Sequence, residues 1–234
     1  PNKPSDTQLY LVISEIMYHP ASPNGDAEYV ELMNISDTKT LELGGVKFTE
    51  GIDFTFPAGT KLAPETRILV ILDETAFEAI HGPGKPIAGI FQNGSRLNNG
   101  SDRMKLEDAS NSSIQEFTYD DELPWPTGPD GGGFSLVLIE PTNSPDHDLS
   151  ANWKQGSFVG GTPGEPEPSG FTGDPNADPD RDGLSNLLEY AFGTSPTQSQ
   201  PSPLEVTVIG TSVQITIPIN LAASDLTINL QSSK

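Results

Sequence analysis

The chain has 234 residues, including 22 prolines and 23 glycines, and 34% of it is hydrophobic. This length can bury one good core, while so many turn-forming residues exclude a mostly helical protein. The formal charge is −21, from 12 Lys and Arg against 33 Asp and Glu. It repels phosphate backbones and anionic lipids, so we expect no nucleic-acid partner and favour cations as small partners.

We recognise no targeting or membrane-anchoring segment in the sequence. No stretch approaches the roughly 20 apolar residues that span a bilayer, so we expect no membrane insertion. The sequence begins at Pro1 without Met, which we interpret as a processed or excised fragment. The absence of cysteine rules out disulfides and thiolate metal sites but does not decide the compartment.

Short β-type runs, separated by turn formers, fill residues 9–153. We predict eight strands: Tyr10–Tyr18, Glu28–Ile35, Leu41–Thr49, Thr66–Leu72, Ile87–Phe91, Arg103–Glu107, Ile114–Tyr119 and Ser135–Glu140. One helical turn is predicted over Glu74–Ile80, before Gly82. Many short strands at regular spacing indicate a sandwich or a barrel.

A series of short sequence words in this region is similar to a known family. The words are Ile13-Ser-Glu-Ile-Met-Tyr-His-Pro20, Glu28-Tyr-Val-Glu-Leu-Met-Asn34, Leu41-Glu-Leu-Gly-Gly-Val-Lys-Phe48, Leu62-Ala-Pro64, Leu97-Asn-Asn-Gly-Ser-Asp102, Met104-Lys-Leu106, Trp125-Pro126, Gly133-Phe-Ser-Leu136, Asn152-Trp153 and Gly161-Thr-Pro-Gly164. Over residues 9–166 they resemble a lamin tail domain of the secreted bacterial type. The resemblance implies an immunoglobulin-like β-sandwich. Residues 21–27 and 141–150 follow no family pattern, and we expect local function there.

Residues that could carry catalysis are few. His19, His81 and His147 show no metal-ligand spacing, and we expect surface or turn roles for them. Alternation along the predicted strand places Glu31 on the face opposite Leu32, and we interpret Glu15, Glu28 and Glu31 as a solvent-facing row of acids. We therefore expect no catalytic residue and no enzyme activity within the chain.

Two further sites remain open as alternatives. Trp125 and Trp153, with Tyr119, could form an aromatic platform for a sugar ring. The cluster Asp146-His147-Asp148 could hold an ion through carboxylate and imidazole groups.

The most specific pattern is an acidic run, Asp178-Pro-Asp-Arg-Asp-Gly-Leu-Ser-Asn-Leu-Leu-Glu189, which follows a linker at 160–170. Oxygen ligands at alternate positions, a glycine at position 6 and a carboxylate at position 12 suit a calcium ion. The predicted metal ligands are Asp178, Asp180, Asp182, the Leu184 carbonyl, Asn186 and Glu189. Four carboxylates this close would repel one another unless a divalent cation neutralised them.

An apolar helical face follows this loop and ends at Gly193, which we predict as the helix C-cap. Because Pro175 and Pro179 disfavour a helix before the loop, the motif is a loop followed by a helix. It resembles the calcium motifs of dockerins and thrombospondin type 3 repeats. Asp174 and Asn176 repeat the alternation upstream and could be outer ligands or a weaker second site.

Three more strands are predicted after a second linker at 198–203: Leu204–Ile209, Val213–Ile219 and Leu226–Leu230. The predicted fold class is therefore mainly β: an immunoglobulin-like sandwich at 9–166, a calcium-binding loop-helix at 171–197 and a partial C-terminal β-domain at 204–234. Loops of this kind in extracellular modules bind calcium at roughly 10⁻⁴ to 10⁻³ M, which favours a secreted or cell-surface location.

Together these patterns predict a non-catalytic, calcium-stabilised structural or interaction segment of a larger secreted or cell-surface bacterial protein. A protein or a cell-surface polysaccharide is the expected partner besides calcium. The alternatives are a carbohydrate-binding or adhesion module, using Trp125 or the 141–150 loop, and an accessory region of a secreted enzyme whose catalytic domain lies outside the chain.

Overall fold

The computed structural model describes residues 3–21, 23, 25–168, 171, 174–209, 212–220, 223 and 226. These belong to two compact units, one of residues 1–156 and 160–166, the other of residues 157–159 and 167–234. Within the described residues, no helix has both the length and the hydropathy needed to span a bilayer.

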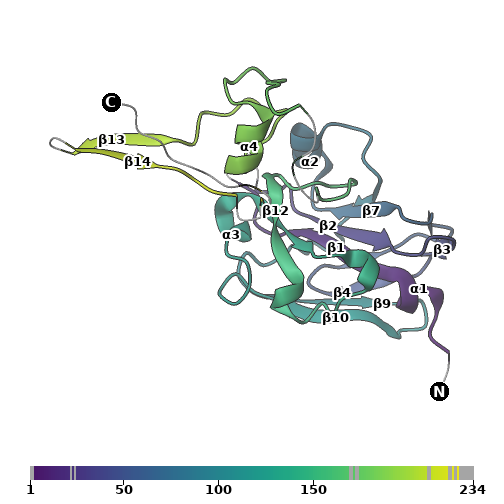
Figure 1. Cartoon of the computed structure of the whole chain (residues 1–234). Helices are drawn as coiled ribbons and strands as arrows, with labels where there is room; N and C mark the ends of the chain where they lie inside the picture. The colour runs from purple at the N-terminus through teal and green to yellow at the C-terminus, as the bar shows by residue number, and fades with distance from the viewer. Residues whose placement is uncertain are drawn as a thin grey trace. The chain divides into compact units, whose positions relative to one another are not determined.

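The first unit is built on two β-sheets (Figure 1). The larger has six strands in the order β12 (Trp153–Val159), β11 (Phe134–Leu138), β1 (Leu11–Met17), β2 (Tyr29–Asn34), β7 (Arg67–Ile71) and β8 (Ile87–Ile90). The smaller has four in the order β10 (Ser113–Tyr119), β9 (Asp102–Glu107), β4 (Lys47–Glu50) and β5 (Phe54–Thr55). A further pair joins β3 (Leu41–Glu42) and β6 (Lys61–Leu62). The expectation of a mainly β architecture is confirmed for this unit.

Most strand pairs are antiparallel, but β7 and β8 run parallel. A parallel pair needs a crossover, and helix α2 (Glu74–His81) lies in the intervening chain. Asp73 caps the start of α2, and Gly82 ends it at φ 69°. The predicted helical turn is therefore confirmed, one residue longer than expected.

Several short elements were not predicted. The expected strand at 41–49 is split into β3 and β4, because the chain turns at Gly45 with φ 84°. The others are β5, β6, β12, and the helices α1 (Asp6–Tyr10), α3 (Pro129–Gly132), η1 (Pro141–Asn143) and η2 (Ser150–Asn152).

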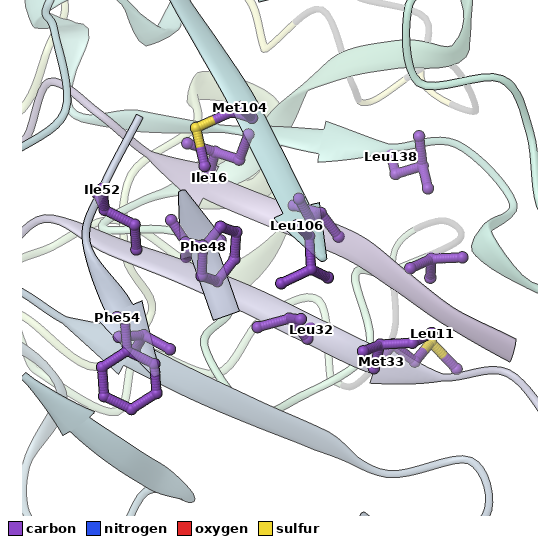
Figure 2. Close-up of a cluster of buried hydrophobic side chains, with 14 of the residues drawn as sticks. Leu11, Ile16, Leu32, Met33, Phe48, Ile52, Phe54, Met104, Leu106 and Leu138 are labelled. Carbon is purple, nitrogen blue, oxygen red and sulfur yellow. The ribbon is translucent and has the colours of Figure 1, made fainter. Parts of the chain in front are cut away.

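One large hydrophobic cluster is shared by strands of both sheets (Figure 2). Ile16 and Leu32 from the larger sheet and Phe48 and Leu106 from the smaller are at most 3% exposed. Apolar burial on this scale is the main stabilising term of such a sandwich.

The opposite face of the larger sheet, which we call the outer face, is also buried. Met17, Tyr29, Leu69 and Ile71 form a second cluster with Phe77 of α2. Because successive strand residues point to opposite faces, the residues between the core positions of β1, β2 and β7 are not solvent-facing.

The second unit contains helix α4 (Asn186–Phe192) and the hairpin of β13 (Glu205–Ile209) and β14 (Ser212–Thr216). Leu184, Ala191 and Phe192 pack together with Ile217 and Leu226. Two predicted C-terminal strands are thus confirmed in part, while residues 227–230 of the third lie outside the described residues. The predicted domain boundaries stay a prediction.

Candidate metal centre

The acidic run forms a tight loop that leads directly into α4. Arg181 and Gly183 adopt φ 63° and 94°, so the turn uses the left-handed region at the position where the pattern has its glycine. The Gly183 N–H donates to Asp178 Oδ2 at 3.1 Å, and the Asp182 N–H donates to Asp180 Oδ1 at 3.3 Å. The loop therefore folds around its own aspartates.

These aspartates converge. Asp178, Asp180 and Asp182 each offer a carboxylate oxygen, and the three oxygens lie within 4.8 Å of one another. Asp182 is held by two donors, the Leu184 N–H at 2.9 Å and the Gln200 N–H at 3.0 Å. The arrangement concentrates negative charge at one point of the loop.

Glu189 is the decisive residue, because its side chain is fully buried and both carboxylate oxygens lack a hydrogen-bond partner. It lies in the first turn of α4, close enough to the three aspartates for their charges to act on it. Buried polar groups are nearly always hydrogen-bonded. A buried carboxylate without hydrogen-bond partners, in the field of three other carboxylates, has the chemistry of a cation ligand.

Other oxygens of the loop are unpartnered as well. Asp178 Oδ1, Asp180 Oδ2 and Asn186 Oδ1 are buried without a hydrogen bond. The Asn186 amide nitrogen donates to the Asp174 carbonyl at 3.1 Å, which leaves its oxygen free for another partner. An all-oxygen set of this kind fits a hard cation such as calcium.

The electrostatics agree with this geometry. Burial, and then the charges of Asp180, Asp182 and Asp178, raise the pKa of Glu189 to about 7. Burial is also the largest cause that raises the pKa of Asp180. Both shifts mean that the loop resists full ionisation when no cation compensates its charge.

The predicted helix after the loop is present. Gly193 ends α4 at φ 77°, and its N–H donates to the Glu189 carbonyl, which confirms it as the C-cap. Upstream, Asp174 Oδ1 accepts the Asn176 N–H at 2.9 Å. Asp174 thus shapes a turn, and its role as a second ion ligand stays a prediction.

The aromatic platform for a sugar ring is wrong. Trp125, Trp153 and Tyr119 are 8%, 3% and 0% exposed and belong to the main hydrophobic cluster. The Trp153 indole N–H donates to the His147 carbonyl at 2.8 Å. These rings stabilise the sandwich and offer no face to a ligand.

His147 lies in a turn, one of the two roles expected for it, but the surface role is wrong. Its ring is 3% exposed, and its pKa is lowered to about 4, chiefly by burial, so the ring is neutral. Nε2 accepts the Ile13 N–H at 3.3 Å, and Nδ1 lies 3.0 Å from the Pro145 carbonyl. Because both nitrogens face backbone groups, His147 cannot complete an ion site with Asp146 and Asp148.

A polar hollow of about 560 Å³ is lined by residues that include His19, Asp26, Glu28, Arg96 and Asn98. Arg96 bridges Asp26 at 2.5 Å and Glu28 at 3.2 Å. Glu28 also accepts the Leu97 N–H at 2.8 Å. The buried polar groups of this hollow are thus paired with one another, in contrast to those of the acidic loop.

The family of the first unit follows from its sequence. A model of the Lamin Tail Domain matches residues 4–121, half of the chain. The chain belongs to the lamin tail domain family. No curated protein matches it.

The lamin tail domain is a non-catalytic, immunoglobulin-like module, in agreement with the two-sheet architecture of the first unit. The family match ends at residue 121, yet β11 and β12 complete the larger sheet after it.

Sequence reasoning misplaced the acids of this lamin tail domain. Glu15, Glu28 and Glu31 are 2%, 2% and 1% exposed, so the solvent-facing row is wrong. The alternation assigned Glu31 correctly to the face opposite Leu32, but that face is covered by other residues. The Gly-rich segment after Val159, interpreted as linker, was the available sign that backbone approaches this face closely.

Proposed function

We propose that the chain is a non-catalytic, calcium-stabilised structural segment of a larger secreted or cell-surface protein. The observation that carries the proposal is the fully buried Glu189, whose two unpartnered oxygens lie in the field of three aspartates. A structural role for the ion explains why a carboxylate is placed where water cannot solvate it.

Six residues would hold the ion: Asp178, Asp180, Asp182, the Leu184 carbonyl, Asn186 and Glu189. When bound, calcium would supply the positive charge that cancels the repulsion among the carboxylates. Two of these residues also connect the loop to the rest of its unit. Glu189 ties the loop to the first turn of α4, and Asp182 ties it to the Gln200 amide that precedes β13.

Helix α4 is the element that this would fix in place. Tyr190, Ala191 and Phe192 are buried on the same helix as Glu189, and Ala191 and Phe192 pack with Leu184. Ion binding would therefore be coupled to the packing of the small apolar cluster in this unit. A cluster of so few side chains has little stability of its own.

The location follows from the expected affinity. Loops of this kind in extracellular modules bind calcium at roughly 10⁻⁴ to 10⁻³ M, so they fill outside cells and stay empty in the cytosol. The net charge of −21 is in keeping with an exterior that is rich in divalent cations. A protein or a polysaccharide of the cell surface remains the proposed partner of the assembled segment.

Isothermal titration of the metal-free full chain with calcium tests the proposal. We expect one site with a dissociation constant of roughly 10⁻⁴ to 10⁻³ M, and at least about tenfold weaker binding after Glu189→Gln. The control is Glu205→Gln, the same chemical change at an exposed position of the same unit, which should bind as the wild type does. Absence of binding at 10 mM calcium, or equal binding by the Glu189 variant, would overturn it.

A further inference from the structure

The polar hollow of about 560 Å³ lies in the first unit and shares no residue with the acidic loop. Two connections line it: residues 19–28, between β1 and β2, and residues 96–99, between β8 and β9. Sites for small molecules typically have volumes of roughly 300 to 1,000 Å³. The hollow is therefore large enough for a small ligand, and its chemistry decides which one.

The second of these connections is fixed by a buried acid. Glu28 is 2% exposed, accepts the Leu97 N–H at 2.8 Å, and lies 3.2 Å from Arg96 Nε. The next residue, Asn98, accepts the buried Tyr119 hydroxyl on its carbonyl at 2.7 Å. Because these bonds are made within the protein, the loop is already ordered before a ligand binds, which lowers the entropic cost of binding.

The exposed side chains of the hollow have hydrogen-bonding capacity to spare. Asn99 is exposed, and its side chain makes no hydrogen bond to any residue that the structure describes. The two ion pairs of Arg96 use Nε and Nη2 and leave Nη1 available. The bond between His19 Nδ1 and Asp130, 2.8 Å long, likewise leaves the other ring nitrogen available. Donors and acceptors are thus presented side by side.

The balance of charge and of donors selects the class of ligand. Among the described lining residues, Arg96 is the one Lys or Arg, against the two acids Asp26 and Glu28, so an anion would meet more negative than positive charge. An organic ammonium ion offers donors alone and would leave the free donors of Asn99 and Arg96 without an acceptor. A hydroxyl group donates and accepts at once, so a neutral polyhydroxyl compound matches the mixed set best.

We propose that this hollow binds a neutral saccharide, whose hydroxyl groups bond to the free groups of Arg96, Asn98 and Asn99. The assignment rests on the proposed function only for the class of the partner, a polysaccharide, and not for calcium. No Trp, Tyr or Phe is among the described residues that line the hollow, so no ring stacks on the sugar. We therefore expect weak binding of a single sugar, with a dissociation constant of roughly 1 mM.

Nitrogen-15 NMR titrations of the full chain in EDTA test the proposal, and their outcome does not depend on the calcium site. The probes are glucose, mannose, galactose, N-acetylglucosamine and the neutral polysaccharides dextran and mannan. At least one should shift the backbone amides of Leu97, Asn98 and Asn99 saturably, with half-saturation at roughly millimolar sugar. Inorganic phosphate and spermidine, as an anion and a cation, should shift them less than that sugar does.

Asn99→Ala should weaken the binding at least about fivefold, because it removes an exposed amide that bonds to nothing else in the protein. Asn143→Ala is the matched control: it removes another exposed amide of the first unit, on η1 and in the 141–150 loop. This variant should bind as the wild type does. The proposal is overturned by the absence of saturable shifts with every sugar at about 50 mM, by equal binding of Asn99→Ala, or by larger shifts with phosphate or spermidine.

Discussion

Replacing Glu189 by glutamine should stabilise the metal-free protein and remove its response to calcium. The carboxylate is buried beside three aspartates, and its pKa is raised from 4.5 to about 7. Since each unit of pKa corresponds to about 1.4 kcal/mol, the charged form costs up to about 3 kcal/mol near pH 8. Water entering the loop screens part of this electrostatic cost. We therefore expect the free energy of unfolding of the metal-free Glu189→Gln variant to exceed that of the wild type by about 1 to 3 kcal/mol.

Scanning calorimetry at pH 8 in the presence of EDTA measures this gain. For a unit of about 70 residues, 1 kcal/mol shifts the midpoint by roughly 4 to 8 °C, so the variant should melt measurably above the wild type. Calcium at 10 mM should raise the midpoint of the wild type and leave that of the variant unchanged. Glu205→Gln should follow the wild type. A metal-free variant less stable than the wild type would refute the reasoning, because Glu189 would then have favourable partners without an ion.

Three other predictions concern the first unit. Burial raises the pKa of Glu28 to about 7, and burial with the charge of Glu15 raises the pKa of Glu31 to about 8. The folded state thus keeps protons that the unfolded chain loses above pH 4.5. The free energy of unfolding should fall by about 2 to 4 kcal/mol from pH 5 to pH 8.5. Urea titrations of Glu28→Gln and of Glu31→Gln should show a weaker dependence of this free energy on pH than the wild type does. Trp153→Ala should cost about 3 to 5 kcal/mol in urea unfolding, whereas Leu123→Ala, at an 84% exposed position, should change stability by less than about 0.5 kcal/mol. Gly161→Ala should lower the melting temperature, because Gly161 has φ 77° and its added Cβ would collide with the Tyr29 hydroxyl and the Glu15 carboxylate. An unchanged midpoint would contradict the close approach of the Gly161 backbone to these side chains.

The regular parts of the fold were predictable because their signals are local. β-branched and aromatic runs between turn formers located eight strand regions, and Asp73 with Gly82 explains why α2 could be bounded to within a residue. The two-residue strands β5 and β6 were missed, because so short a run has no periodicity of its own.

The environment of side chains was harder to predict than their direction. Alternation correctly placed Glu31 on the face opposite Leu32. Whether that face meets water depends on α2 and on residues 160–164, which are far from Glu31 in the sequence. His147 shows the same limit, since its partner Ile13 is 134 positions distant. By contrast, the acidic loop is contained in twelve consecutive residues, so its spacing alone named the side chains that converge.

The central claim is that the oxygens between Asp178 and Glu189 hold a calcium ion, and a crystal structure determined with 10 mM calcium tests it most directly. We predict anomalous density for one ion, bound at about 2.3 to 2.6 Å by oxygens of Asp178, Asp180, Asp182 and Glu189 and by the Leu184 carbonyl. A loop without an ion, with Glu189 still buried and unpartnered, would contradict the account.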